Sequence, residues 1–144
     1  MNWKYESMEE LREYEAKRTA VESILEEIRQ LKAQMVKLGG SSGTTPVKGG
    51  GSLWEDRQIN LIVKLDKLDT SLTLSKDWVS KVERGLAVLN AEEMLVLDRF
   101  YINPAKGNVD RLCGDLHLEK SAVYERRDKA LRRNTLARYG CMEV

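Results

Sequence analysis

The chain has 144 residues, the length of one ordinary domain or of two very small ones. Charged residues make up 33% of it and aromatic residues 6%, with 10 glycines and 2 prolines, a composition that favours helices over a β-sandwich or barrel. One histidine and two cysteines supply neither a zinc site nor a disulfide framework, and no segment approaches the ~20 apolar residues of a membrane span. We therefore expect an all-α, non-enzymatic protein of the reducing cytoplasm, with no cofactor, no metal site, no catalytic residue and no membrane partner.

Two long segments have the apolar spacing of helices that pair with other helices. In residues 6–38, apolar residues alternate spacings of three and four, a repeat of about 3.5 residues that forms a seam along one side. Residues 53–89 continue the same register, although residues 70–75 have poor helix propensity and allow a kink or break. The seam residues are Val21, Ile24, Ile28, Leu31, Met35 and Leu38, then Leu61, Leu65, Leu68, Leu72, Val79, Val82, Leu86 and Leu89.

Residues 39–52 separate the two segments and are rich in glycine, so we expect a flexible loop there. Residues 1–89 then form a coiled-coil-like helical hairpin, or each seam pairs with a second subunit. A hairpin leaves apolar residues exposed beside its seams, which predicts a homodimer; a closed monomeric bundle with the C-terminal segment is the alternative. The apolar residues in question are Leu25, Ile59, Ile62 and Val63. The expected seam or dimer contacts also include Trp3, Trp54 and Trp78.

Residues 90–139 have the pattern of a small trihelical domain, and residues 140–144 form a tail. Asn90 followed three positions later by Glu93 is a capping-box start. The first predicted helix ends at Asn103-Pro104, the second runs over 109–116 with Asn108 as its cap, and the third runs from Lys120 to about Arg133.

Residues 112–123 look like a helix-turn-helix. In that motif a small residue packs inside the first helix, here Cys113, a residue of positive φ forms the turn, here His117, and a branched apolar residue locks the second helix, here Val123. The remaining core positions hold Leu112, Leu116 and Leu118. With its flanking helices, the segment 90–139 resembles region 4 of bacterial sigma factors. The whole chain resembles the phage and prophage regulators of the ArpU and RinA type, which implies a transcriptional regulator of phage late genes.

The third helix carries the candidate DNA-binding residues. Residues 120–138 hold seven Lys and Arg against two carboxylates, a local charge of about +5 that attracts phosphate. With Val123 and Ala130 facing the core, helical geometry turns the opposite side outward; that side carries Ser121, Glu125, Asp128 and Arg132. The predicted base-edge residues in the major groove are Lys120, Ser121, Tyr124 and Glu125. The predicted phosphate contacts are Arg127, Lys129, Arg132 and Arg133. Arg126 occupies a usually apolar position, where its stem is expected to help packing.

The sequence therefore predicts a sequence-specific DNA-binding transcriptional regulator whose partner is double-stranded DNA. Two alternatives stay open at this point. One is a helical adaptor that binds no DNA and contacts RNA polymerase through the basic helix. The other is a small phage DNA-packaging subunit that oligomerises through its helices.

Overall fold

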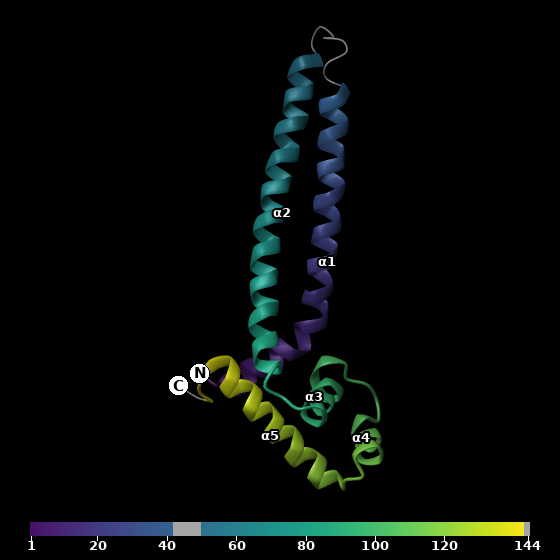
Figure 1. Ribbon diagram of the computed structural model, residues 1–144, viewed down its shortest axis with the longest axis vertical. Helices are drawn as coiled ribbons and strands as arrows, with labels where there is room; N and C mark the ends of the chain where they lie inside the picture. Colours follow the sequence, from purple (N-terminus) through teal and green to yellow (C-terminus); the bar gives the residue numbers. More distant parts are fainter. Residues whose placement is uncertain (42–49, 143–144) are drawn as a thin grey trace. The chain divides into compact units, whose positions relative to one another are not determined.

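The computed structural model describes residues 1–41 and 50–142, and all regular structure in these residues is helical (Figure 1). The helices are α1 (Trp3–Ser41), α2 (Gly50–Leu86), α3 (Ala91–Leu97), the π-helical turn η1 (Asp98–Ile102), α4 (Asn108–Leu116) and α5 (Lys120–Tyr139). The expected all-α class is confirmed. Among the described helices, none combines the length and hydrophobicity that crossing a membrane requires.

The chain divides into two compact units. Residues Thr19–Lys76 form the first, which we call the hairpin unit. Residues Met1–Arg18 and Asp77–Val144 form the second, which we call the C-terminal unit. This division differs from the expected change at residues 89 and 90, because the first turns of α1 and the last turns of α2 pack with the C-terminal helices.

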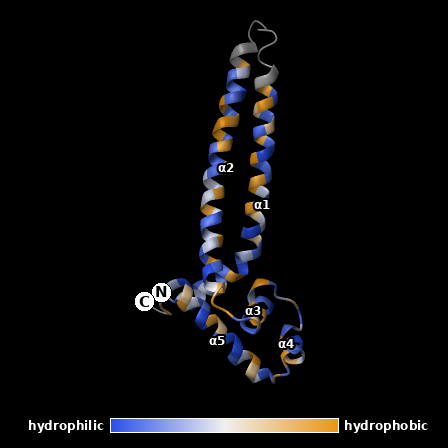
Figure 2. Ribbon diagram, in the orientation of Figure 1, coloured by the Kyte–Doolittle hydropathy of each residue, from blue (hydrophilic) through white to orange (hydrophobic). Residues whose placement is uncertain are grey.

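In the hairpin unit, α1 and α2 lie side by side (Figure 1). The Trp54 indole N–H donates to the Leu38 carbonyl oxygen at 3.1 Å, which fixes the level of one helix against the other. Figure 2 shows hydrophobic residues along both helices. Of the seam residues in this unit, Ile28 and Leu31 are buried, and the others are only half-buried. Two helices alone therefore cover their shared apolar side incompletely.

The helix ends and the polar run of α2 differ from expectation. The break allowed at residues 70–75 does not occur, because α2 continues to Leu86. The Thr70 and Thr73 hydroxyls donate to the carbonyl oxygens four residues earlier, at 3.1 and 3.0 Å, so both side chains are satisfied within the helix. The predicted loop 39–52 is also too long at both ends, since α1 reaches Ser41 and α2 begins at Gly50. Its remaining residues, 42–49, lie outside the described residues.

The C-terminal unit joins the start of α1 to the end of α5. The Trp3 ring stacks on Tyr139 with 4.4 Å between centroids, and the Trp3 backbone N–H donates to the Met142 carbonyl oxygen at 2.9 Å. The Asn134 amide donates to the Ser7 hydroxyl at 2.9 Å in a buried position. In the predicted tail, residues 140–144, Gly140 caps α5 and Met142 accepts the hydrogen bond from Trp3. The helix α5 itself runs to Tyr139, past its predicted end near Arg133.

Gly85, in the last turn of α2, allows this close packing. A Cβ atom on Gly85 would lie 2.6 Å from Asn134 Oδ1, 3.2 Å from the Asn134 carbonyl oxygen and 3.3 Å from Arg138 Cβ. Asn134 is 3% exposed and is held by Ser7, so it has little room to retreat. A side chain at position 85 would therefore force α2 and α5 apart.

We expect Gly85→Ala to destabilise the protein by about 1–3 kcal/mol, as overpacking of a buried contact does. Helix propensity alone would give the opposite sign, a gain of up to ~1 kcal/mol. Gly114→Ala is the matched control, because Gly114 lies inside α4 with nothing within 4 Å of its added Cβ. Urea unfolding followed by circular dichroism measures both variants. Equal stabilisation of the two would show that α2 and α5 do not approach as closely as described.

Candidate nucleic-acid interface

The candidate interface residues are carried by a small apolar core shared by α3, α4 and α5. Val96, Leu112 and Val123 are fully buried and form its centre. The partly buried residues packed around them are Leu95, Phe100, Val109, Cys113, Leu116 and Leu118. The core positions assigned from the sequence to Cys113, Val123 and the three leucines are therefore confirmed.

The connection between α4 and α5 turns at His117. Its backbone is left-handed, with φ 55° and ψ 44°, and it is the one residue besides glycine with positive φ in the described chain. The amides of His117 and Leu118 both donate to the Cys113 carbonyl oxygen, the second at 3.2 Å. The prediction that His117 is a turn residue is confirmed. Glu119 precedes α5 as its N-cap without a capping hydrogen bond from its side chain.

Asn108 does not cap α4, contrary to expectation. The helix starts at Asn108 itself, and the N-cap is Gly107, with φ 78°. The Asn108 side chain accepts from the Ala105 amide at 3.0 Å and donates to the Arg99 carbonyl oxygen. It therefore stabilises the preceding turn and leaves the start of α4 without a side-chain cap. The predicted capping box of α3 is present, with Asn90 and Glu93 bonded reciprocally at 2.8 and 3.1 Å.

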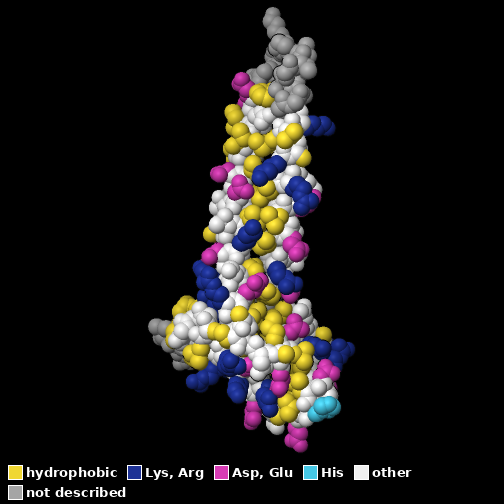
Figure 3. Space-filling view, viewed as in Figure 1, with side chains coloured by type: hydrophobic (Ala, Val, Ile, Leu, Met, Phe, Trp, Pro, Cys, Tyr) yellow, Lys and Arg dark blue, Asp and Glu magenta, His cyan; other side chains and the backbone are white. Residues whose placement is uncertain are grey.

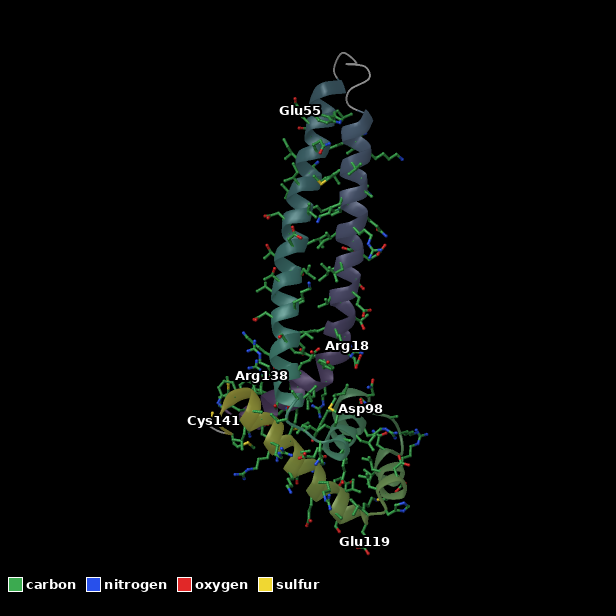
Figure 4. The ribbon with its side chains drawn as sticks, in the orientation of Figure 1. Arg18, Glu55, Asp98, Glu119, Arg138 and Cys141 are labelled. Atoms are coloured by element: carbon green, nitrogen blue, oxygen red, sulfur yellow. The ribbon has the colours of Figure 1, made fainter. Side chains whose placement is uncertain are left out.

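The two sides of α5 are as helical geometry predicts. Its buried side carries Val123, Ala130, Leu131, Asn134 and Thr135. The residues expected to point outward are all exposed: Ser121, Glu125, Asp128 and Arg132. The helix continues to Tyr139, and Figure 4 labels Glu119 and Arg138 near its two ends.

The four predicted base-edge residues lie together in the first turns of α5 and are exposed. Lys120 and Tyr124 also line a groove of about 340 Å³ with Phe100 and the first residues of α4. Phe100 is not among the predicted site residues. Its spacing resembles that of a core residue, so no pattern in the sequence distinguishes it as a groove residue.

Arg127 packs on aromatic rings instead of extending freely. Its guanidinium lies 5.1 Å from the Phe100 ring centre and 5.0 Å from that of Tyr124, and the two rings are 6.0 Å apart. Asp128 also accepts from it, at 3.0 Å. These contacts hold the Tyr124 ring against the domain, so Arg127 positions a base-edge candidate in addition to carrying charge.

Most of the positive charge of α5 is neutralised within the protein. Besides Arg127, three of its arginines pair with carboxylates from other helices: Arg126 with Glu92, Arg133 with Glu93, and Arg138 with Glu10. Arg133 also donates to the Val88 carbonyl oxygen at 2.9 Å. Arg133, a predicted phosphate contact, thus ties α5 to the capping box of α3. Arg126 is exposed, and its guanidinium pairs with Glu92 of α3.

Three cations of α5 have no ion-pair partner in the part of the chain that the structure describes: Lys120, Lys129 and Arg132. All three are exposed. Lys120 lies at the start of the helix, and Arg132 lies about three turns further along, on the outward side. Lys129 lies between them in the sequence and lines a small hollow with Glu92 and Glu93 of α3. Unpaired cations on a rigid helix are the groups best placed to meet phosphate or a base edge. In the described residues, no cluster of His, Cys, Asp and Glu is suited to hold a metal ion.

Glu10, on α1, holds the far end of α5. It accepts from Arg138 at 3.3 Å and from the Tyr139 hydroxyl. Burial raises the pKa of its carboxyl above the ordinary value of 4.5, and this outweighs the opposite effect of the Arg138 charge. The ionised form of Glu10 is therefore disfavoured by the fold, although an arginine lies beside it.

Comparisons with known proteins add no family assignment. No family model, no curated protein sequence and no solved structure matches this chain.

The raised pKa of Glu10 sets a pH dependence of stability. A carboxyl whose pKa is higher in the folded state stabilises the fold when protonated, and this contribution disappears as the pH rises through the folded pKa. We expect the unfolding free energy of the wild type, measured against that of Glu10→Gln, to fall as the pH rises above about 4.5. Paired urea titrations between acidic and neutral pH test this. A difference that increases with pH would mean that Arg138 outweighs burial.

Proposed function

We propose that this chain is a sequence-specific, DNA-binding transcriptional regulator of phage or prophage genes, similar to the ArpU and RinA type. The observation that carries the proposal is the set of unpaired, exposed cations on α5, the helix that follows the His117 turn. A helix held from behind by a small core and charged on its outer side suits the major groove of DNA.

The side chains of α5 divide by role. In the first turns, Lys120 donates to guanine O6 or N7, Glu125 accepts from cytosine N4, and Tyr124 contacts a thymine methyl group. Ser121 lies beside them and bonds to a base edge or a sugar. Lys129 and Arg132 contact phosphates and fix the register of the helix on the duplex. Arg127 supports Tyr124 from behind, and Arg133 keeps α5 attached to α3.

The protein binds as a homodimer in this proposal. Two recognition helices then reach half-sites about 34 Å apart, or a multiple of that distance, on one face of the duplex. Doubling the contacts matters here because each subunit offers few free cations. A short set of phosphate contacts gives weak binding for a monomer at physiological salt.

Lys129→Ala and Arg132→Ala should each weaken binding to all DNA sequences alike. Each should also reduce the slope of log affinity against log salt by about 0.9 per lost phosphate contact. Fluorescence anisotropy on labelled duplexes over a salt series gives both quantities.

Arg126→Ala is the matched control, because it removes the same charge from the same helix at a position already neutralised by Glu92. Its salt slope should stay close to that of the wild type. Two results contradict the proposal: a wild type without DNA affinity, or Lys129 and Arg132 variants with unchanged slopes. The basic helix would then belong to a protein partner such as RNA polymerase, as in the adaptor alternative.

Lys120→Ala should instead lower specificity. We expect a loss of roughly 1–3 kcal/mol on the preferred site and much less on random DNA, since a base-edge contact is lost only where the correct base is present. Selection of binding sites from random duplexes, followed by titration of the best site, measures the difference. An equal loss on both DNAs would reassign Lys120 to a phosphate.

A further inference from the structure

The hairpin unit has a groove along one side, between α1 and α2. Two hollows of about 430 and 410 Å³ share Gln34 and Lys64 in their walls, so they are adjacent. The bottom of the groove is formed by seam residues of both helices: Leu31, Leu38, Leu61 and Leu68. The groove therefore opens onto the apolar side that the two helices fail to bury completely.

Further apolar surface adjoins this groove. Val63 lines one edge and is 48% exposed, and Ile59, one turn before it on α2, is 57% exposed. Ile62, which does not line the groove, is a further exposed apolar residue of α2, at 52%. The visible face of the hairpin unit in Figure 3 shows hydrophobic side chains along its length, with Lys and Arg side chains at their borders. Two helices with a half-covered seam become a complete core when two more helices pack on them, as in a four-helix bundle.

The charges of the groove are of opposite sign at its two ends. Glu27 lines one end and Arg57 lines the other, and both side chains are exposed. Neither has an ion-pair partner within the described residues of the hairpin. The bond between Trp54 and Leu38 marks a common level of the two helices. At ~1.5 Å per residue, Glu27 then lies roughly 16 Å from that level and Arg57 roughly 5 Å, both towards the base of the hairpin.

We infer that a second copy of this chain occupies the groove, with its hairpin unit antiparallel to the first. A two-fold axis midway between the two ends brings Glu27 of each copy level with Arg57 of the other, and the two grooves close over one apolar core. The same operation brings Lys67 level with Glu55 and Asp56 of the other copy, in the part of α2 that Figure 4 marks with Glu55. Parallel pairing would instead set Arg57, Lys64 and Lys67 against their own copies, which like-charge repulsion disfavours.

This inference rests on the proposed function, because it specifies the interface of the proposed homodimer. The interface itself forms without DNA. Its test therefore uses the full-length protein alone, by sedimentation velocity at micromolar concentration with circular dichroism as a check of folding. The wild type should sediment with twice the chain mass of 16.5 kDa. Glu27→Lys and Arg57→Glu should each weaken the dimer by about tenfold or more, because each sets like charges opposite one another twice per dimer. The double variant carrying both changes restores opposite charges and should recover most of the wild-type affinity.

Arg29→Glu is the control, since Arg29 pairs with Glu26 on its own helix and does not line the groove. It should leave the dimer intact. A monomeric wild type, a single reversal without effect, or a double variant no better than the singles would overturn the interface. Loss of the dimer would weaken DNA binding, but the salt slopes of the Lys129 and Arg132 variants would still report whether α5 contacts DNA. Loss of DNA binding would leave this interface unchanged, so the two failures are distinguishable.

Discussion

The packing of Val123 against Val96 and Leu112 is the contact on which the C-terminal unit depends. It fixes the rotation of α5 about its own axis, and the helical repeat then determines which residues face outward along all its turns. A second set of buried residues, Asn134 and Thr135, continues the same side towards the end of the helix. The outward side makes no contribution to this packing. Its residues are therefore free to be selected for a ligand, while the buried side preserves their orientation.

Features that depend on short-range pattern were predictable. The capping box at Asn90 and the left-handed turn at His117 follow from a few neighbouring residues, and backbone geometry allows few alternatives to them. The buried position of Val123 follows from the spacing of the motif, and the exposed Ile59 and Ile62 follow from the narrow width of a hairpin seam. The residues that determine each of these features lie close to it in the sequence.

Features that depend on a distant partner were not predictable. Arg133 and Glu93 are 40 residues apart in the sequence, and nothing local distinguishes that arginine from Arg132, which faces outward one position earlier. The local charge of about +5 overstated the free charge for the same reason, since the neutralising carboxylates lie on other helices. Asn108 illustrates a smaller version of this limit. Its side chain could cap α4 or accept a hydrogen bond within the preceding turn. It accepts from the Ala105 amide, so it does not cap the helix.

The contacts of Ser7 and Glu10 with the end of α5 have a consequence for synthesis of the chain. The paired residues are 127 to 129 positions apart, so the first turns of α1 emerge from the ribosome long before their partners exist. The hairpin unit, which lies between them in the sequence, is made of neighbouring segments and can form early. Until the last residues of α5 are released, Trp3 and Leu11, which are covered in the finished fold, stay exposed to chaperones and proteases. The C-terminal unit can therefore close only after α5 has been synthesised, which is later than the synthesis of the hairpin unit.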